Sequence, residues 1–297
     1  MTNRLRLIFT WTLILIASPI AIILWRTLAP NESYWWPWLH GFALLFLLSI
    51  TLIHPLLKSL RRFAAIVTII FFLGYGGGWN WGLIPFIRSS EIWISWTNTA
   101  PVALYEITLH SLRLTPALLI LLFLFATKRK RADFFLIKGD IHASVERSRI
   151  LRTKNHEPWV KIASIFAAVF VVGTIIFLFG ASEIQWNQFI MNWPLIPVAI
   201  LVALMNGFNE EFTLRAAPLG ELEPSIGKSD SLLVTTAYFG LGHYYGVPSG
   251  VIGVILSGFL GWLLGKSMLE TRGFLIAWMV HFITDIPIFL FFITGSI

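Results

Sequence analysis

The chain has 297 residues, of which 57% are hydrophobic and only 12% are charged. Soluble domains carry about 25% charged residues, so this composition excludes an ordinary water-soluble globule and favours a surface that faces lipid. The formal net charge is +7, but the basic residues fall in short clusters between apolar runs, which is typical of membrane-protein loops and excludes a nucleic-acid-binding face. The chain holds no cysteine, so disulfides, thiolate nucleophiles and cysteine metal sites are excluded.

The first apolar run extends from Leu7 to Trp25 and follows Arg4 and Arg6. A signal peptide begins in the same way. This run is longer than a signal h-region, however, and it lacks a convincing small-x-small cleavage site. We therefore expect it to be retained as the first membrane helix.

Further apolar runs follow along the chain, and a membrane-spanning helix needs about 20 largely apolar residues. The sequence therefore predicts an all-α protein, a polytopic bundle of about eight or nine transmembrane helices. The fourth span is the least secure, because Glu106, His110 and Arg113 interrupt it. In chain order, the candidate spans are 7–25, 36–57, 63–87, 101–127, 160–180, 194–215, 231–247, 249–267 and 273–294.

The basic residues orient these spans. With nine alternating spans and a cytoplasmic N-terminus, every Lys and Arg lies in a cytoplasmic segment except Arg26, Arg88 and Arg113. An excess of basic residues in cytoplasmic loops is what sets the orientation of membrane helices. We therefore expect an integral membrane protein with its N-terminus in the cytoplasm, and we take the membrane to be a bacterial inner (plasma) membrane.

The longest polar stretch divides the chain. We expect a four-span membrane region at 1–127, a basic cytoplasmic loop at 128–158 and a five-span membrane domain at 159–297. The run from Lys128 to Arg131 is a positive topology signal, with anionic lipid headgroups as the alternative partner.

Ionisable side chains within a membrane are costly, so each one is a candidate functional residue. Glu211 and Arg215 lie four residues apart at the cytoplasmic end of the sixth span, on one helix face, where they can form an ion pair. Glu210 lies about 100° around the helix from Glu211. It is left without that partner in a poorly hydrated place, which makes it the candidate general base.

Two later spans carry histidines. His243 belongs to the seventh span, and His281 and Asp285 lie four residues apart on one face of the ninth. Taken singly, a membrane histidine more often forms a helix–helix hydrogen bond than it catalyses a reaction, and an Asp one turn after it can serve only to orient it. The combination favours a functional site, because a base, two imidazoles and a second carboxyl on three helices can converge at one depth.

The signatures of other membrane proteases can be compared with the sequence. The motifs H-E-x-x-H, G-x-S-G and G-x-G-D are absent from the sequence. The motifs present are Glu210-Glu211-x-x-x-Arg215, Phe239-x-x-x-His243 and His281-x-x-x-Asp285. In this order they resemble the CPBP family, which includes the CAAX prenyl proteases (type II CAAX endopeptidases) and bacteriocin-processing intramembrane proteases. The resemblance covers roughly Trp159 to Ile297 and implies that 159–297 is the catalytic membrane domain.

The resemblance also implies a reaction and its residues. It implies an intramembrane endopeptidase that cleaves a peptide or membrane protein near the cytoplasmic membrane face, among membrane lipids. Glu210 would activate the attacking water, and His243 would help to hold it. His281 and Asp285 would face the carbonyl oxygen as it becomes an oxyanion, while Glu211 and Arg215 would fix the helix end.

Asp285 departs from the family pattern, in which an asparagine is common at this position. An ionised aspartate cannot donate a hydrogen bond to an oxyanion. Either Asp285 is protonated when it acts, or its role in this chain is different.

Three alternatives stay open. Two histidines and a glutamate form a recognised catalytic zinc set, so Glu210, His243 and His281 are also candidate zinc ligands, although the resemblance favours a mechanism without metal or cofactor. A non-proteolytic membrane immunity or scaffolding protein of the same family is a second alternative. A transporter that uses these residues as a proton relay is a third.

Overall fold

The computed structural model describes residues 2–29, 35–75, 80–154 and 156–295. This part of the chain is 78% helix and contains no strand. Its β-structure is limited to isolated bridges in the polar segment before α9, such as the bridge between Ser144 and Pro158. The predicted all-α fold class is therefore confirmed.

The chain divides into two compact units, and each is assembled from segments that are distant in the sequence. The first unit comprises Met1–Ser90, Pro116–Leu136 and Phe212–Lys266. The second unit comprises Glu91–Thr115, Ile137–Glu211 and Ser267–Ile297. The division at 127 and 158 that the sequence suggested stays a prediction.

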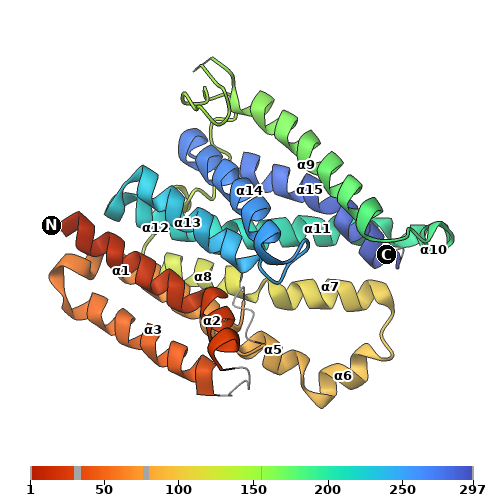
Figure 1. Cartoon of the computed structure of the whole chain (residues 1–297), viewed down its shortest axis with the longest axis horizontal. Coiled ribbons are helices and arrows are strands. Elements are labelled where there is room, and N and C mark those ends of the chain that lie inside the picture. Colours follow the sequence, from red (N-terminus) through yellow and green to blue (C-terminus); the bar gives the residue numbers. More distant parts are fainter. Residues whose placement is uncertain (1, 30–34, 76–79, 155, 296–297) are drawn as a thin grey trace. The chain divides into compact units, whose positions relative to one another are not determined.

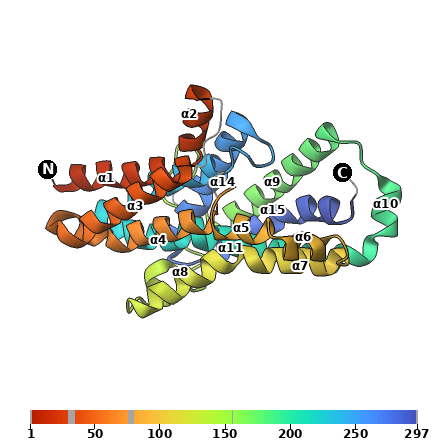
Figure 2. The ribbon, with the colours of Figure 1, turned by 90° about the horizontal axis from the view of Figure 1, so that it is seen from below.

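The second unit is built around α15, which packs against α11 and α9, while α7 packs on α11 (Figures 1 and 2). Its helices are α6 (Glu91–Thr97), α7 (Val102–Arg113), α9 (Trp159–Ala181), α10 (Trp186–Met191), η3 (Trp193–Leu195), α11 (Ile196–Glu211) and α15 (Leu275–Ile293).

A glycine allows the close approach of α11 and α15. A Cβ atom on Gly207 would lie only 3.2 Å from the backbone nitrogen of Phe282. One turn earlier on α11, the carbonyl of Leu204 accepts a hydrogen bond from Nε1 of Trp278, at 3.1 Å. These contacts bring the end of α11 next to the middle of α15, where the sequence placed its candidate site residues.

The first unit gathers α1 against α3, α4 and α12, with α13 packed on α12. Its elements are α1 (Thr2–Ala17), α2 (Ile20–Leu28), α3 (Trp35–Ile53), η1 (Pro55–Leu60), α4 (Arg61–Leu73), α5 (Leu83–Arg88), η2 (Arg131–Phe134), the π-helix η4 (Phe212–Ala216), α12 (Ala217–Ile226) and α13 (Lys228–Gly242). Most of α8 (Thr115–Ala126) and of α14 (Gly250–Thr271) also belongs to this unit.

Several helical segments are long and apolar enough to cross a membrane. Among the described residues there are six, or seven if α1 and α2, which meet at a bend of 60°, form one broken span. The six are Trp35–Ile53, Val102–Ala126, Trp159–Ala181, Trp193–Ile226, Gly250–Thr271 and Leu275–Ile293. The predicted count of eight or nine spans is not confirmed.

The difference lies in the predicted spans 63–87 and 231–247. In the first, α4 ends at Leu73 because Gly74 adopts a left-handed conformation, with φ 73°. In the second, α13 has 15 residues, which extend about 22 Å at 1.5 Å per residue. The hydrocarbon core of a bilayer is about 30 Å thick, so neither helix is long enough to cross it alone.

The first unit also contains a carboxylate held by two arginines. Glu221 on α12 is 2% exposed. Its two oxygens accept hydrogen bonds from Nε of Arg62 and Nε of Arg129, both at 2.6 Å. This arrangement ties α12 to the start of α4 and to the segment after α8.

We expect Glu221→Gln to destabilise the protein by about 3 kcal/mol, because removing one partner of a buried ion pair leaves the other charges uncompensated. Thermal unfolding of the purified protein in detergent measures the change. Glu183 is exposed, so Glu183→Gln serves as the matched control and should stay within about 0.5 kcal/mol of wild type. Equal unfolding temperatures for the two variants would show that the contacts of Glu221 with Arg62 and Arg129 do not stabilise the fold.

Candidate active site

The end of α11 and the middle of α15 gather four acidic or imidazole side chains in the second unit. Glu211 is fully buried, and Glu210, His281 and Asp285 are 9%, 4% and 7% exposed. The sequence predicted three of them as catalytic and Glu211 as a supporting residue. Because burying charge is expensive, a cluster of this kind is maintained only with specific partners.

The imidazole of His281 is the centre of the cluster. Its Nδ1 lies 2.6 Å from Oε1 of Glu211. Since a carboxylate only accepts hydrogen bonds, Nδ1 is the donor. The other ring nitrogen, Nε2, lies 3.7 Å from Oε2 of Glu210 and 3.6 Å from Oδ2 of Asp285. Glu211 therefore orients the ring, so that Nε2 faces the other two carboxyl groups.

Asn206, which the sequence analysis did not single out, joins the two sides of the cluster. It lies one turn before Glu210 on α11 and is 8% exposed. Its Nδ2 donates to Oε1 of Glu210 at 3.2 Å and to Oδ2 of Asp285 at 2.9 Å. The sequence did contain a signal for this residue, because Asn206 is a polar side chain in an apolar helix, four positions before the candidate base.

Helix α7 adds one charged side chain and one titratable side chain near this site. Nη2 of Arg113 lies 3.9 Å from Oε1 of Glu210. One turn earlier, Nδ1 of the buried His110 lies 2.9 Å from the carbonyl oxygen of Glu106. These residues entered the sequence analysis only as interruptions of a span, although the cost of intramembrane charge applies to them equally.

The supporting role predicted for Glu211 and Arg215 rested on an unbroken α-helix. The chain forms a π-helix at Phe212–Ala216 directly after Glu211, and a π-helix has i→i+5 hydrogen bonds, so residues four apart no longer stack as in an α-helix. In the first unit, the guanidinium of Arg215 lies over the ring of Phe239, 4.2 Å from its centroid. The ion pair between Glu211 and Arg215 stays a prediction.

His243 belongs to the first unit, where it caps the C-terminus of α13. Its Nδ1 lies 2.8 Å from the carbonyl oxygen of Phe239, and the centroids of the two rings are 4.4 Å apart. The spacing of the Phe239-x-x-x-His243 motif thus corresponds to a contact across one helical turn. The predicted role of His243 at the water molecule stays a prediction.

The predicted zinc set has one member, His243, in the first unit and two, Glu210 and His281, in the second. Within the part of the chain that the structure describes, no group of three or more His, Cys, Asp or Glu side chains is arranged to hold a metal ion.

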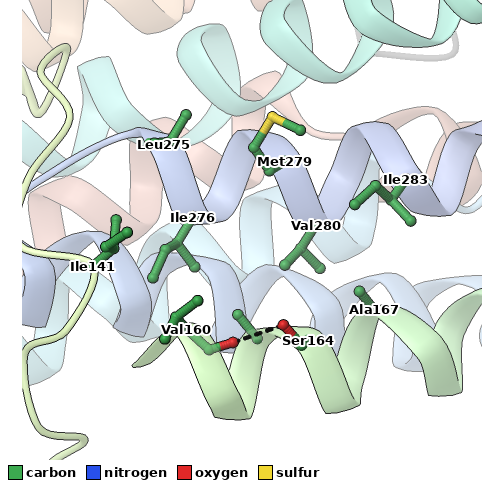
Figure 3. A pocket seen from close by; sticks show the side chains of 10 residues that line it. Ile141, Val160, Ser164, Ala167, Leu275, Ile276, Met279, Val280 and Ile283 are labelled. Carbon is green, nitrogen blue, oxygen red and sulfur yellow. Dashed lines mark hydrogen bonds between the residues drawn. The ribbon is translucent and has the colours of Figure 1, made fainter. Parts of the chain in front are cut away.

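The opposite face of α15 borders an apolar groove of about 170 Å³ in the second unit (Figure 3). Ile276, Val280 and Ile283 line it from α15, and Val160 and Ala167 line it from α9. At about 100° per residue, these positions of α15 point away from His281 and Asp285. The helix is therefore polar toward α11 and apolar toward α9.

The comparison with protein families identifies the segment that carries this cluster. Residues 192–287 match the family model for Rce1-like proteins, described as type II CAAX prenyl endopeptidase Rce1-like. The match includes all three sequence motifs and leaves α1 to α10 outside. It confirms the family resemblance that the motifs indicated. The searches of curated proteins and of solved structures found no match.

Proposed function

We propose that this protein, an integral membrane member of the CAAX-type protease family through its Rce1-like segment, is an intramembrane endopeptidase. In this proposal it hydrolyses a peptide bond of a peptide or membrane protein near the cytoplasmic face of the membrane. Glu210 acts as the general base, without a metal ion.

The observation that carries the proposal is the burial of Glu210 beside His281. In the proposal, Oε2 of Glu210 binds the attacking water, and Nε2 of His281, 3.7 Å from that oxygen, lies next to the water on the side of the substrate carbonyl. A carboxylate within hydrogen-bond distance of that water can take its proton as the water attacks a carbonyl carbon. His243, from the resemblance, would help to hold the water.

The remaining groups would serve the oxyanion. In the proposal, His281 acts as an imidazolium with a proton on each ring nitrogen, and Asp285 acts in its protonated form. Nε2 of His281 and the carboxyl of Asp285 then donate to the carbonyl oxygen as its negative charge develops. The hydrogen bond of 2.6 Å from His281 to Glu211 fixes the ring for this task, and such fixed donors lower the barrier because they need no reorganisation during the reaction.

A comparison of cell proteomes tests the proposal. Cells that carry the wild-type protein are compared with cells that carry Glu210→Gln at the same expression level, and membrane proteins are mapped for changes in length. We expect at least one protein to be shortened in wild type and to accumulate uncut in the variant. Identical protein lengths in both, together with a retained cellular phenotype, would instead favour a non-proteolytic immunity or scaffolding role.

Metal removal separates the proposed mechanism from a zinc peptidase. We expect the purified active protein to contain no stoichiometric zinc and to keep its activity through prolonged treatment with a strong chelator. Metal analysis and activity measurements before and after chelation provide the check. Loss of activity on chelation, with recovery on adding zinc, would transfer the mechanism to zinc held by Glu210, His243 and His281.

The proposed orientation, with a cytoplasmic N-terminus, is testable because the chain has no native cysteine. Ser144 and Ser182 are both exposed and lie before and after the membrane span α9. We expect a membrane-impermeant thiol reagent to label Ser144→Cys only from the cytoplasmic side and Ser182→Cys only from outside. The reverse pattern would contradict the orientation and put the site at the other membrane face.

A further inference from the structure

Two carboxyl groups from different helices meet at the amide of Asn206. Glu210 belongs to α11 and Asp285 to α15, and each accepts one hydrogen bond from Nδ2 of Asn206, at 3.2 and 2.9 Å. An amide nitrogen carries two protons, so these two bonds use its donor capacity completely. Oε1 of Glu210 and Oδ2 of Asp285 are the acceptors in these two bonds, and the nitrogen side of the amide therefore faces them.

The bond to Asn206 gives the two oxygens of Glu210 different surroundings. Oε1 is the oxygen that faces Nδ2 of Asn206, with Nη2 of Arg113 at 3.9 Å. Oε2 is the oxygen that faces Nε2 of His281, at 3.7 Å. One oxygen is thus held by neighbouring donors, while the other is directed to where the proposal has the water bound.

We infer that Asn206 is a positioning residue of this site. It holds Oε1 of Glu210 and Oδ2 of Asp285 together through one amide group and thereby aims Oε2 of Glu210 at the attacking water. This inference rests on the proposed function and deepens it. The position lies one turn before the three motifs begin, on the same helix as the base.

Geometry and charge both support such a role. Asn206 is buried among acids, and its own Oδ1 accepts no hydrogen bond from the residues that the structure describes. Only its donors are therefore engaged, and both serve the reacting carboxyls. Without the amide, Glu210 and Asp285 would lose the one donor that both of them share at hydrogen-bond distance.

The first variant removes the amide and keeps its approximate volume. Asn206→Leu should lower kcat by about tenfold to a hundredfold, since small misplacements of a reacting group have effects of this size, with little change in KM. It should also move the acid side of the pH–activity profile to higher pH, because ionised Glu210 loses a donor. Among the described residues of the second unit, the charged or titratable groups around Glu210 are His281 and Asp285 from α15, Glu211 from α11, and Arg113 and His110 from α7.

A second pair of variants exchanges the amide and the carboxyl group between positions 206 and 285. Asn206→Asp places a fourth carboxyl in the cluster, beside those of Glu210, Glu211 and Asp285, and should lower activity by about a hundredfold or more. The double variant Asn206→Asp with Asp285→Asn restores one amide between carboxyls. We expect its activity to return to within about tenfold of wild type, because the two positions are coupled directly.

Thr284→Val is the matched control. Thr284 is buried beside Asp285 in the sequence, and its hydroxyl donates to the carbonyl of Val280 on its own helix, at 2.8 Å. Removing that hydroxyl should leave both the rate and the pH profile at wild-type values. All variants are compared as purified full-length proteins in proteoliposomes, with a pool of internally quenched apolar peptides as the substrate and thermal unfolding as the check of folding.

The outcomes separate the inference from the proposed function. If wild type cleaves the pool no faster than Glu210→Gln, the proposed function fails and this inference fails with it. If wild type is active and Glu210→Gln is not, the proposed function holds, and the Asn206 variants then test the positioning role. A lower rate with an unshifted pH profile in Asn206→Leu, or no recovery in the folded double variant, would reduce Asn206 to a structural residue.

Discussion

Glu210→Gln is expected to lower the rate of peptide cleavage by about 10²–10⁴-fold, which is the usual contribution of a general base, while the protein stays folded. Glutamine has nearly the same size as glutamate, and its amide oxygen can still accept the hydrogen bond from Asn206. The basic oxygen that faces His281 is lost. Initial rates with the quenched peptide pool and thermal unfolding of the same preparations measure the two effects separately.

Glu211→Gln is the informative comparison for Glu210→Gln, because it makes the same chemical change at the next residue of the chain. Glu211 is fully buried and holds Nδ1 of His281 at 2.6 Å. Replacing it should lower the yield and the unfolding temperature as well as the rate, since a buried charged partner is removed. Equal and purely catalytic losses in both variants would contradict the assignment of Glu210 as base and Glu211 as support.

Asp285→Ala should lower the rate by about a hundredfold or more, as the removal of an oxyanion donor does, whereas Asp285→Asn should keep most of the activity. The side-chain oxygen of the asparagine can accept from Nδ2 of Asn206, as Oδ2 of Asp285 does at 2.9 Å. Its amide nitrogen can donate to an oxyanion at every pH. Rates of both variants, measured across pH on folded protein, provide the check.

The role of Asp285 would be different if asparagine proved nearly as damaging as alanine. An anionic metal ligand or a base cannot be replaced by an amide, so a correctly folded but inactive Asp285→Asn protein would favour the zinc alternative. An intermediate loss would indicate that Asp285 mainly orients His281. Nδ1 of that ring is hydrogen-bonded to Glu211, so Asp285 can orient the ring only through Nε2.

Much of the candidate site follows from local helical geometry. Residues four apart share a helix face, so His281 and Asp285 were expected together, and their side chains lie 3.6 Å apart. The same rule failed to describe the next turn of α11, because the chain changes to a π-helix at Phe212. Nothing in the residue pattern indicated that change.

Contacts between distant segments could not be predicted from periodicity. Arg113 reaches Glu210 from α7, almost a hundred residues earlier in the chain. Asn206 joins Glu210 to Asp285 because Gly207 allows α11 and α15 to approach closely. A sequence shows that such residues are polar in an apolar setting, but the partner of each depends on which helices pack together.

The number of spans shows the limit of hydropathy alone. The run at 63–87 is apolar, but its helix stops at Gly74, whose left-handed backbone favours glycine. The run at 231–247 overlaps the 15-residue helix α13, which begins at Lys228 and ends at Gly242. The run at 7–25 is long enough, and yet Pro19 lies at the break where α1 and α2 bend by 60°. Length and apolarity identified the membrane class, while glycine and proline decided where helices end.

The most direct test uses the protein that accumulates uncut in Glu210→Gln cells. That protein is purified and reconstituted with either wild type or Glu210→Gln in water labelled with ¹⁸O, and the products are sequenced by mass spectrometry. The account predicts that wild type cuts a single peptide bond near the cytoplasmic membrane face and adds one labelled oxygen to the new C-terminus, while Glu210→Gln leaves the chain whole. Cleavage by both proteins, or by neither, would contradict the claim that Glu210 activates the water of an intramembrane peptidase.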